Sequence, residues 1–300
     1  CASLMPVWLL LQPRDYINSH QLIVGLLLIY AAIFYVNPLV SADMIRSDSD
    51  LTAPPMFPFL FVTIACGAIS GFHGLVSSGT TSKQLNKMSD SRMIGYGSMI
   101  GEGLLALATI IAAVAGIALV TQCTINGIHY DNLLWSDYYN SWNHAVNNKA
   151  LAFVLGGSAL LEQLGFSSII SRTLISVLII SFAATTLDTA TRIQRFVITE
   201  LGSTLNIKLL KNKFFATICG ITPAYFLTIN ESAWQLWPIF GASNQMLAAL
   251  TLMILSIYFI NKNHKFSVNL IIPMIIIIGI TITALSYKLN KFIIQGNSLL

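Results

Sequence analysis

Residues 67–83 read GAISGFHGLVSSGTTSK and interrupt a strongly apolar segment that begins near residue 57. Glycine weakens a helix by up to ~1 kcal/mol per residue, and this segment carries it at positions 67, 71, 74 and 79. At helical spacing three polar side chains share one face: Ser70, His73 and Ser77. We expect a broken helix whose free backbone groups bind a small ligand. Close packing of small residues is the alternative, and it explains the glycines but not the polar face.

The composition is that of an integral membrane protein. Of 300 residues, 55% are hydrophobic and only 9% are charged, and the mean hydropathy is +0.72. Soluble domains carry roughly 25% charged residues, so this chain could not cover a surface that faces water. Its apolar runs approach the ~20 residues that a helix needs to cross a bilayer. They are continuous rather than alternating, which favours helices over a barrel. We therefore expect a lipid bilayer, and no nucleic acid, as a partner.

The apolar runs predict an all-α bundle in a single transmembrane domain over residues 1–300, with seven crossings at 20–37, 57–79, 94–121, 168–191, 213–230, 238–260 and 267–287. Lysine and arginine concentrate in cytoplasmic loops, so segments 80–93 and 192–213 belong inside, while 122–148, which has neither, belongs outside. Residues 150–164 must then be re-entrant or interfacial rather than a crossing. The first residue is not Met and Leu4–Leu11 is too short to span, so we expect a fragment whose first helix is cut.

A second polar stretch, FAATTLDTATR at 182–192, lies in the predicted crossing 168–191. One helical arc of about 100° holds five polar residues, four from this stretch and the serine that precedes it: Ser181, Thr185, Asp188, Thr189 and Arg192. A charge at mid-bilayer costs ~2.5–3.5 kcal/mol, so this face must meet protein or a water-filled path. One interpretation is a local pair of Asp188 with Arg192 one turn later. The other is a proton or cation site in which Asp188 acts with the hydroxyls of Thr185, Thr186 and Thr189. The residues do not choose between H⁺ and Na⁺.

Two further polar positions lie within predicted crossings. Glu102 is about two turns into 94–121, as either a protonated structural carboxylate or a coupling site. Asn244, followed by Gln245, enters 238–260, where interhelical hydrogen bonding and substrate contact both remain open. Motifs of catalytic, cofactor and metal sites are absent, including HExxH, GxSxG, Walker A and cysteine–histidine zinc spacings. An intramembrane hydrolase built on Ser77 and His73 would lack an oxyanion hole and an orienting acid.

Four stretches together resemble the carbon starvation protein A family of bacterial inner-membrane transporters. They are PVWLLLQPRDY at Pro6–Tyr16, the Pro54–Leu85 segment with GAISGFHGLVSSGTTSKQL, FAATTLDTATRIQR at Phe182–Arg195, and WPIFGASNQMLAALTL at Trp237–Leu252. Family members are considerably longer, so the resemblance implies that N-terminal helices of the same protein are missing from this chain.

The resemblance implies a multi-pass inner-membrane protein that takes up peptides or pyruvate during nutrient limitation, driven by protons rather than Na⁺. It also implies an inverted-repeat fold like that of amino-acid/cation symporters. Known residue roles do not carry over, so the expected site rests on the motifs themselves. We expect substrate to contact Ser70, Gly71, His73, Ser77, Ser78 and Asn244. The coupling ion would be taken by Asp188, Thr185, Thr186, Thr189 and Glu102.

In this hypothesis the broken helix at 57–79 and the helix at 168–191 face one another across a central site. The protein would then be no enzyme and would need no cofactor or resident metal. A non-transporting membrane sensor or assembly subunit is the rival from another class, and an intramembrane hydrolase is a third. Substrate identity and oligomeric state are not set by these residues.

Overall fold

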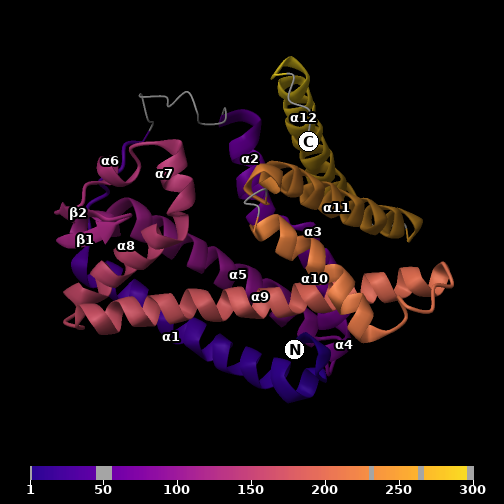
Figure 1. Cartoon of the computed structure of the whole chain (residues 1–300). Helices are drawn as coiled ribbons and strands as arrows, with labels where there is room; N and C mark the ends of the chain where they lie inside the picture. Colours follow the sequence, from indigo (N-terminus) through magenta and orange to yellow (C-terminus); the bar gives the residue numbers. More distant parts are fainter. Residues whose placement is uncertain (1, 45–55, 230–232, 263–266, 296–300) are drawn as a thin grey trace. The chain divides into compact units, whose positions relative to one another are not determined.

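The computed structural model describes residues 2–44, 56–229, 233–262 and 267–295 (Figure 1). Apart from one short hairpin, the described elements are helices, which confirms the predicted all-α polytopic bundle. The chain forms two compact units, each assembled from two segments of sequence. Unit 1 comprises Cys1–Ala53 and Lys87–Ala190, and unit 2 comprises Pro54–Asn86 and Thr191–Leu300. Each unit is described by itself below, and the single domain over residues 1–300 stays a prediction.

Unit 1 is built from four helical segments, one of which is a short central helix that the other three enclose. A π-helical turn at Val7–Leu11 leads into α1 (Gln12–Val36). The second segment, α5 (Asp90–Ile111), continues through a π turn at Ala112–Gly116 and a 3-10 turn at Ile117–Leu119. The central helix is α8 (Lys149–Gln163), and the fourth segment is the first part of α9 (Ser168–Thr204).

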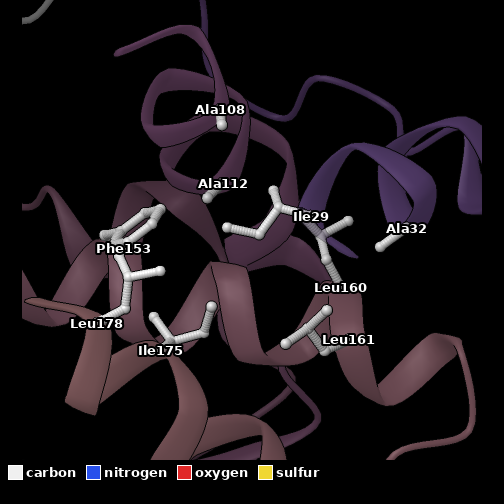
Figure 2. Close-up of a cluster of buried hydrophobic side chains, with 9 residues drawn as sticks. All are labelled: Ile29, Ala32, Ala108, Ala112, Phe153, Leu160, Leu161, Ile175 and Leu178. Atoms are coloured by element: carbon white, nitrogen blue, oxygen red, sulfur yellow. The ribbon is translucent and has the colours of Figure 1, made fainter. Parts of the chain in front are cut away.

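The core of unit 1 is apolar and centres on α8. Figure 2 shows side chains from α1, α5, α8 and α9 converging there, and its members are Ile29, Ala32, Ala108, Ala112, Phe153, Leu160, Leu161, Ile175 and Leu178. Two glycines make the close approach possible: a Cβ on Gly156 would collide with the Ala112 carbonyl oxygen, and one on Gly116 would lie 2.5 Å from the Gly156 carbonyl oxygen. This helix corresponds to the predicted re-entrant or interfacial piece, whose placement in the bilayer stays a prediction.

A hairpin lies between α5 and α8, where the sequence predicted an outer loop. Strands β1 (Gln122–Ile125) and β2 (Ile128–Asp131) pair antiparallel, and two short helices follow, α6 (Trp135–Tyr138) and α7 (Trp142–Asn147). The turn residues Asn126 and Gly127 have φ of 51° and 82°. A type I′ turn needs positive φ at both central residues, and Asn-Gly supplies it. This dipeptide was the sequence signal for the hairpin.

Unit 2 contains the interrupted helix. Helix α2 (Met56–Ala68) ends, and α3 (Gly71–Val76) begins after two intervening residues. A π turn at Ser77–Thr81 and the short α4 (Ser82–Gln84) follow. The remaining helices of the unit are α10 (Lys213–Ile229), α11 (Ala233–Asn261) and α12 (Ser267–Gln295). The break predicted from the glycines is confirmed. Ser70 is extended there, with φ −91° and ψ 133°.

Six helices are long and apolar enough to cross a membrane, which makes the chain a multi-pass membrane protein. Within the described residues they are Trp8–Val36, Met56–Gln84, Asp90–Leu119, Ser168–Thr204, Ile239–Asn261 and Val268–Asn290. The first begins at residue 8, earlier than the predicted 20–37, because residues 12–19 are helical rather than a connecting loop. The predicted crossing at 213–230 matches α10, which has 17 residues and would be about 25 Å long. The number of crossings stays a prediction.

Candidate functional site

One side of the break in unit 2 is held by the amide side chain of Asn244 from α11. The Asn244 Oδ1 atom accepts a hydrogen bond from the Phe72 amide at 3.0 Å, and its Nδ2 atom donates to the Ser70 hydroxyl at 2.9 Å. The Ser70 hydroxyl also accepts from the Phe72 amide at 3.2 Å, which makes Ser70 the N-cap of α3. A helix start leaves backbone N–H groups without intrahelical partners. Asn244 therefore stabilises the broken conformation of a segment 172 residues away in sequence.

The neighbouring residue Gln245 holds the other side of the break. Its side chain is fully buried, and its Nε2 atom donates to the Val62 carbonyl oxygen of α2. Its Oε1 atom accepts from the Thr281 hydroxyl of α12 at 3.3 Å. Both polar ends of the amide are thus satisfied, as buried polar groups require. Together, Asn244 and Gln245 contact α2, α3 and α12 from a single turn of α11.

Close backbone packing accompanies these hydrogen bonds. Gly71, the first residue of α3, is buried, and a Cβ there would lie 2.5 Å from the Asn244 carbonyl oxygen and 2.8 Å from the Ala248 amide nitrogen. One turn further on, a Cβ on Gly74 would lie 3.1 Å from the Thr251 hydroxyl. The two glycines fit the small-residue packing that the sequence left open as an alternative. In this segment, packing and the break occur together.

The structure brings together three of the six residues predicted to contact substrate: Ser70, Gly71 and Asn244. The other three lie further along the segment and are exposed: His73, Ser77 and Ser78. The hydroxyls of Ser77 and Ser78 both donate to the Gly74 carbonyl oxygen, at 3.0 and 2.9 Å. A hydroxyl bound in this way to the preceding turn is a common helix feature. The role of each of these residues in substrate binding stays a prediction.

In unit 1 the buried Asp188 forms an ion pair with Arg14 of α1. The Asp188 Oδ2 atom lies 3.5 Å from the Arg14 Nη2 atom, and the Asp188 side chain is only 6% exposed. A helical turn closer to the core of unit 1, Asn18 donates to the Ser181 carbonyl oxygen at 3.3 Å and to the Thr185 hydroxyl. We call Arg14, Asn18, Thr185 and Asp188 the Asp188 cluster. It joins α1 and α9 through polar contacts between residues more than 160 positions apart.

The structure places the other predicted coupling residues around or away from this cluster. Thr189 is half-buried next to Asp188, whereas Thr186 is exposed and its hydroxyl donates to the Phe182 carbonyl oxygen at 3.0 Å. Glu102 lies on α5 and is exposed. Arg192, the local partner proposed for Asp188, is buried as well. The predicted site between 57–79 and 168–191 would join the two units, and it stays a prediction.

Sequence reasoning missed Arg14 and Asn18. Both precede the predicted crossing at 20–37, although the Pro6–Tyr16 stretch that resembles the family contains Arg14. Their spacing of four residues, which puts both on one face of a helix that continues into an apolar membrane segment, was the signal that could have found them. Among the described residues, no group of three or more His, Cys, Asp or Glu side chains could hold a metal ion.

The geometry defines a class of protein: a multi-pass helix bundle with an interrupted membrane helix and a buried carboxylate that is paired with a half-buried arginine. The family described as carbon starvation protein CstA matches residues 1–284, so the chain belongs to that family and the resemblance is confirmed. No solved structure matches the chain.

Curated relatives carry two kinds of name. The chain is 31% identical to "Peptide transporter CstA" of Helicobacter pylori (strain J99 / ATCC 700824), over 93% of this chain and 47% of the relative. It is 29% identical to "Peptide transporter CstA" of Bacillus subtilis (strain 168), over 84% and 46%. It is 30% identical to "Pyruvate/proton symporter BtsT" of Escherichia coli (strain K12), over 96% and 49%. The chain thus spans about half the length of these relatives.

Proposed function

We propose that the protein containing this chain is a secondary active transporter of the bacterial inner membrane. It takes up peptides or small carboxylates such as pyruvate, in response to carbon starvation, and protons drive the uptake. The names of the relatives support this proposal, because two of them are called peptide transporters and a third a pyruvate/proton symporter. The same names favour transport over catalysis and over a purely sensory or assembly role.

The observation that carries the proposal is the buried Asp188 carboxylate on a helix long enough to span a membrane. Ionisable groups in such helices are costly and are found mostly on ion and substrate pathways. Its pairing with Arg14 does not by itself supply a structural reason for the charge. Replacing a buried ion pair with apolar residues is often neutral or stabilising. A carboxylate that gains and loses a proton during transport explains why the charge is present.

The break between α2 and α3 supports the proposal independently. Secondary transporters bind substrates and coupling ions at interrupted membrane helices, where backbone groups are free of intrahelical hydrogen bonds. In this chain Asn244 and Ser70 occupy the break and bond to each other and to the Phe72 amide. A substrate that binds there would exchange hydrogen bonds with this pair. We assign the substrate contacts to Ser70, Gly71 and Asn244 first, and to His73, Ser77 and Ser78 along the same segment.

The test is uptake by the full-length protein in proteoliposomes. Labelled pyruvate and labelled dialanine are offered separately, with an inward proton gradient, with an inward Na⁺ gradient, and with neither. We expect accumulation of at least one substrate under the proton gradient alone. Accumulation that follows the Na⁺ gradient would show that Na⁺, rather than the proton, is the coupling ion. The absence of uptake of either substrate would refute the proposal that the protein is a transporter.

The coupling role of Asp188 is tested by Asp188→Asn, with Asp131→Asn as the matched control. Asp131 lies in the hairpin, where its side chain is 69% exposed. We expect Asp188→Asn to abolish accumulation driven by the proton gradient and to retain exchange of labelled for unlabelled substrate, which needs no net proton movement. Asp131→Asn should retain both activities. If Asp188→Asn still accumulated substrate against its gradient, Asp188 would not be the coupling group.

A further inference from the structure

Arg14 is held by its carboxylate partners at one nitrogen only. Its Nη2 atom lies 3.5 Å from Asp188 Oδ2 and 3.4 Å from Asp15 Oδ1. The Nε atom is buried and has no hydrogen-bond partner among the described residues. Guanidinium groups bind carboxylates best through two parallel N–H bonds. Neither Asp15 nor Asp188 contacts Arg14 in this way.

The unused donor matters because a buried N–H without a partner is costly. The N–H groups of Nε and Nη2 point to the same edge of the planar guanidinium. A carboxylate on that edge would satisfy Nε and would compete with Asp188 for Nη2. The contact at 3.5 Å is longer than the 2.7–2.9 Å or so of a well-formed charged hydrogen bond. Asp188 is therefore a partner that a better-placed carboxylate can displace.

We propose that Arg14 binds the carboxylate of the transported substrate, and that the substrate takes the place of Asp188 at the Nε/Nη2 edge while Asp188 accepts a proton. This inference rests on the proposed function and specifies its substrate class: a monocarboxylate, or a peptide with a free C-terminus. It also gives the proton and the substrate carboxylate adjoining places within the Asp188 cluster, as a contact additional to those assigned to the break between α2 and α3. Asn18 is a neutral member of the cluster, and its hydrogen bonds hold α1 against α9.

The exchange leaves the net charge of the cluster unchanged. Before binding, the Arg14 guanidinium faces the Asp188 carboxylate. After binding, the guanidinium faces the substrate carboxylate, and Asp188 is neutral because the entering proton is on one of its oxygens. An uncompensated charge is expensive in a medium of low dielectric constant. Proton and substrate carboxylate therefore bind most favourably together, which is the requirement for symport.

The surrounding elements carry further charged or titratable groups: Asp15 and His20 on α1, Asp90, Arg92 and Glu102 on α5, Lys149 and Glu162 on α8, and Arg172, Arg192, Arg195 and Glu200 on α9. Asp15 contacts the same Arg14 nitrogen but is exposed, so water screens it. His20 is also exposed, and its Nδ1 atom bonds to the Tyr16 carbonyl oxygen. Arg192 follows Asp188 by one turn and is buried. Asp188 is the buried carboxylate that contacts Arg14.

The experiment measures binding through exchange, using the full-length protein in proteoliposomes. Entry of labelled pyruvate or labelled dialanine is competed by the unlabelled substrate or by its amide, which lacks the carboxylate. For the wild type we expect half-maximal inhibition of entry to need a concentration of the amide at least about ten-fold higher than that of the parent acid. In Arg14→Gln the half-saturation concentration of the acid should rise by about the same factor, while inhibition by the amide stays the same.

Three variants complete the test. Arg14→Lys keeps the charge but not the planar fork, so its half-saturation should lie between those of the wild type and Arg14→Gln. Arg92→Gln removes an exposed arginine of α5 and should behave as the wild type. In the wild type we expect the half-saturation concentration to rise with pH, because substrate binding needs a proton on Asp188. Asp188→Asn removes the need for that proton, so its half-saturation concentration should not change with pH. If Arg14→Gln does not fold alone, the double variant with Asp188→Asn, which removes the charge of Asp188 as well, replaces it in the comparison, with Asp188→Asn as its reference.

Equal half-saturation concentrations of the acid in the wild type and in Arg14→Gln would overturn the inference. Equal loss of affinity for the acid and the amide in Arg14→Gln would also overturn it, because that result indicates general damage to the site. Either result would leave gradient-driven uptake by the wild type intact. The proposed function fails separately, through the absence of any wild-type uptake.

Discussion

Replacement of Gly71 by alanine perturbs the junction on which the broken helix depends. The added Cβ would lie 2.5 Å from the Asn244 carbonyl oxygen, 2.6 Å from the Leu247 Cβ and 2.8 Å from the Ala248 amide nitrogen. Cβ atoms essentially never approach heavy atoms this closely. Two of the three atoms belong to the backbone of α11, so a change of rotamer cannot relieve the contact. Helix α3 must move away from α11, and the hydrogen bond from the Phe72 amide to Asn244 must lengthen.

The expected cost follows from this geometry. Overpacking a well-packed contact destabilises by about 1–3 kcal/mol, and the involvement of backbone atoms favours the upper end. A shift of about 2–4 °C per kcal/mol then lowers the midpoint of thermal unfolding by roughly 2–12 °C. Substrate exchange should weaken as well, because Ser70 and Asn244 no longer meet across the break.

The assay compares Gly71→Ala with Gly67→Ala in the purified full-length protein, using tryptophan fluorescence during heating. Gly67 is the matched control, because it lies four residues earlier on α2 and a Cβ there meets nothing within 4 Å. Alanine favours a helix over glycine by up to about 1 kcal/mol, so Gly67→Ala should be neutral or slightly stabilising. Equal midpoints for the two variants would refute the close approach of α3 and α11.

Three further predictions concern ionic, polar and pH effects on the thermal midpoint. Arg14→Gln should destabilise the folded protein by about 3–5 kcal/mol, because it leaves Asp188 buried without this partner. The double variant Arg14→Gln with Asp188→Asn should recover much of that loss. Additive effects of the two substitutions on stability would contradict the ion pair between Arg14 and Asp188. Asn244→Ala should cost about 1–2 kcal/mol and couple to Ser70→Ala by about 0.6 kcal/mol in a double-mutant cycle, whereas zero coupling would contradict their hydrogen bond. Burial raises the pKa of the Tyr138 phenol in the folded protein. The unfolded chain ionises this phenol from about pH 10, so the thermal midpoint should fall as the pH rises above that value. Tyr138→Phe should reduce this fall, and an unchanged dependence of the midpoint on pH would exclude Tyr138 as its source.

The sequence by itself determined the features that depend on local chemistry. A charged fraction of 9% sufficed to identify a membrane bundle, because so few charges cannot cover a surface in water. The glycines and Ser70 located the helix break, since backbone freedom and capping act within a few residues. The helical period put Asp188 on a polar face that has to be covered. The Asn126-Gly127 dipeptide was a local signal as well, although the sequence prediction for this region was an outer loop rather than a hairpin.

Tertiary structure decided which group each of these residues meets. Periodicity assigns a side chain to a face of its helix but does not say which other helix covers that face. The pairing of Asp188 with Arg14 and the capping of the break by Asn244 join positions 174 and 172 residues apart. Local spacing predicted Arg192 as a partner of Asp188, and the packing of the chain brings Arg14 to Asp188 as well. Close helix approach at Gly71 and Gly156 likewise depends on what lies opposite, which only the packed chain determines.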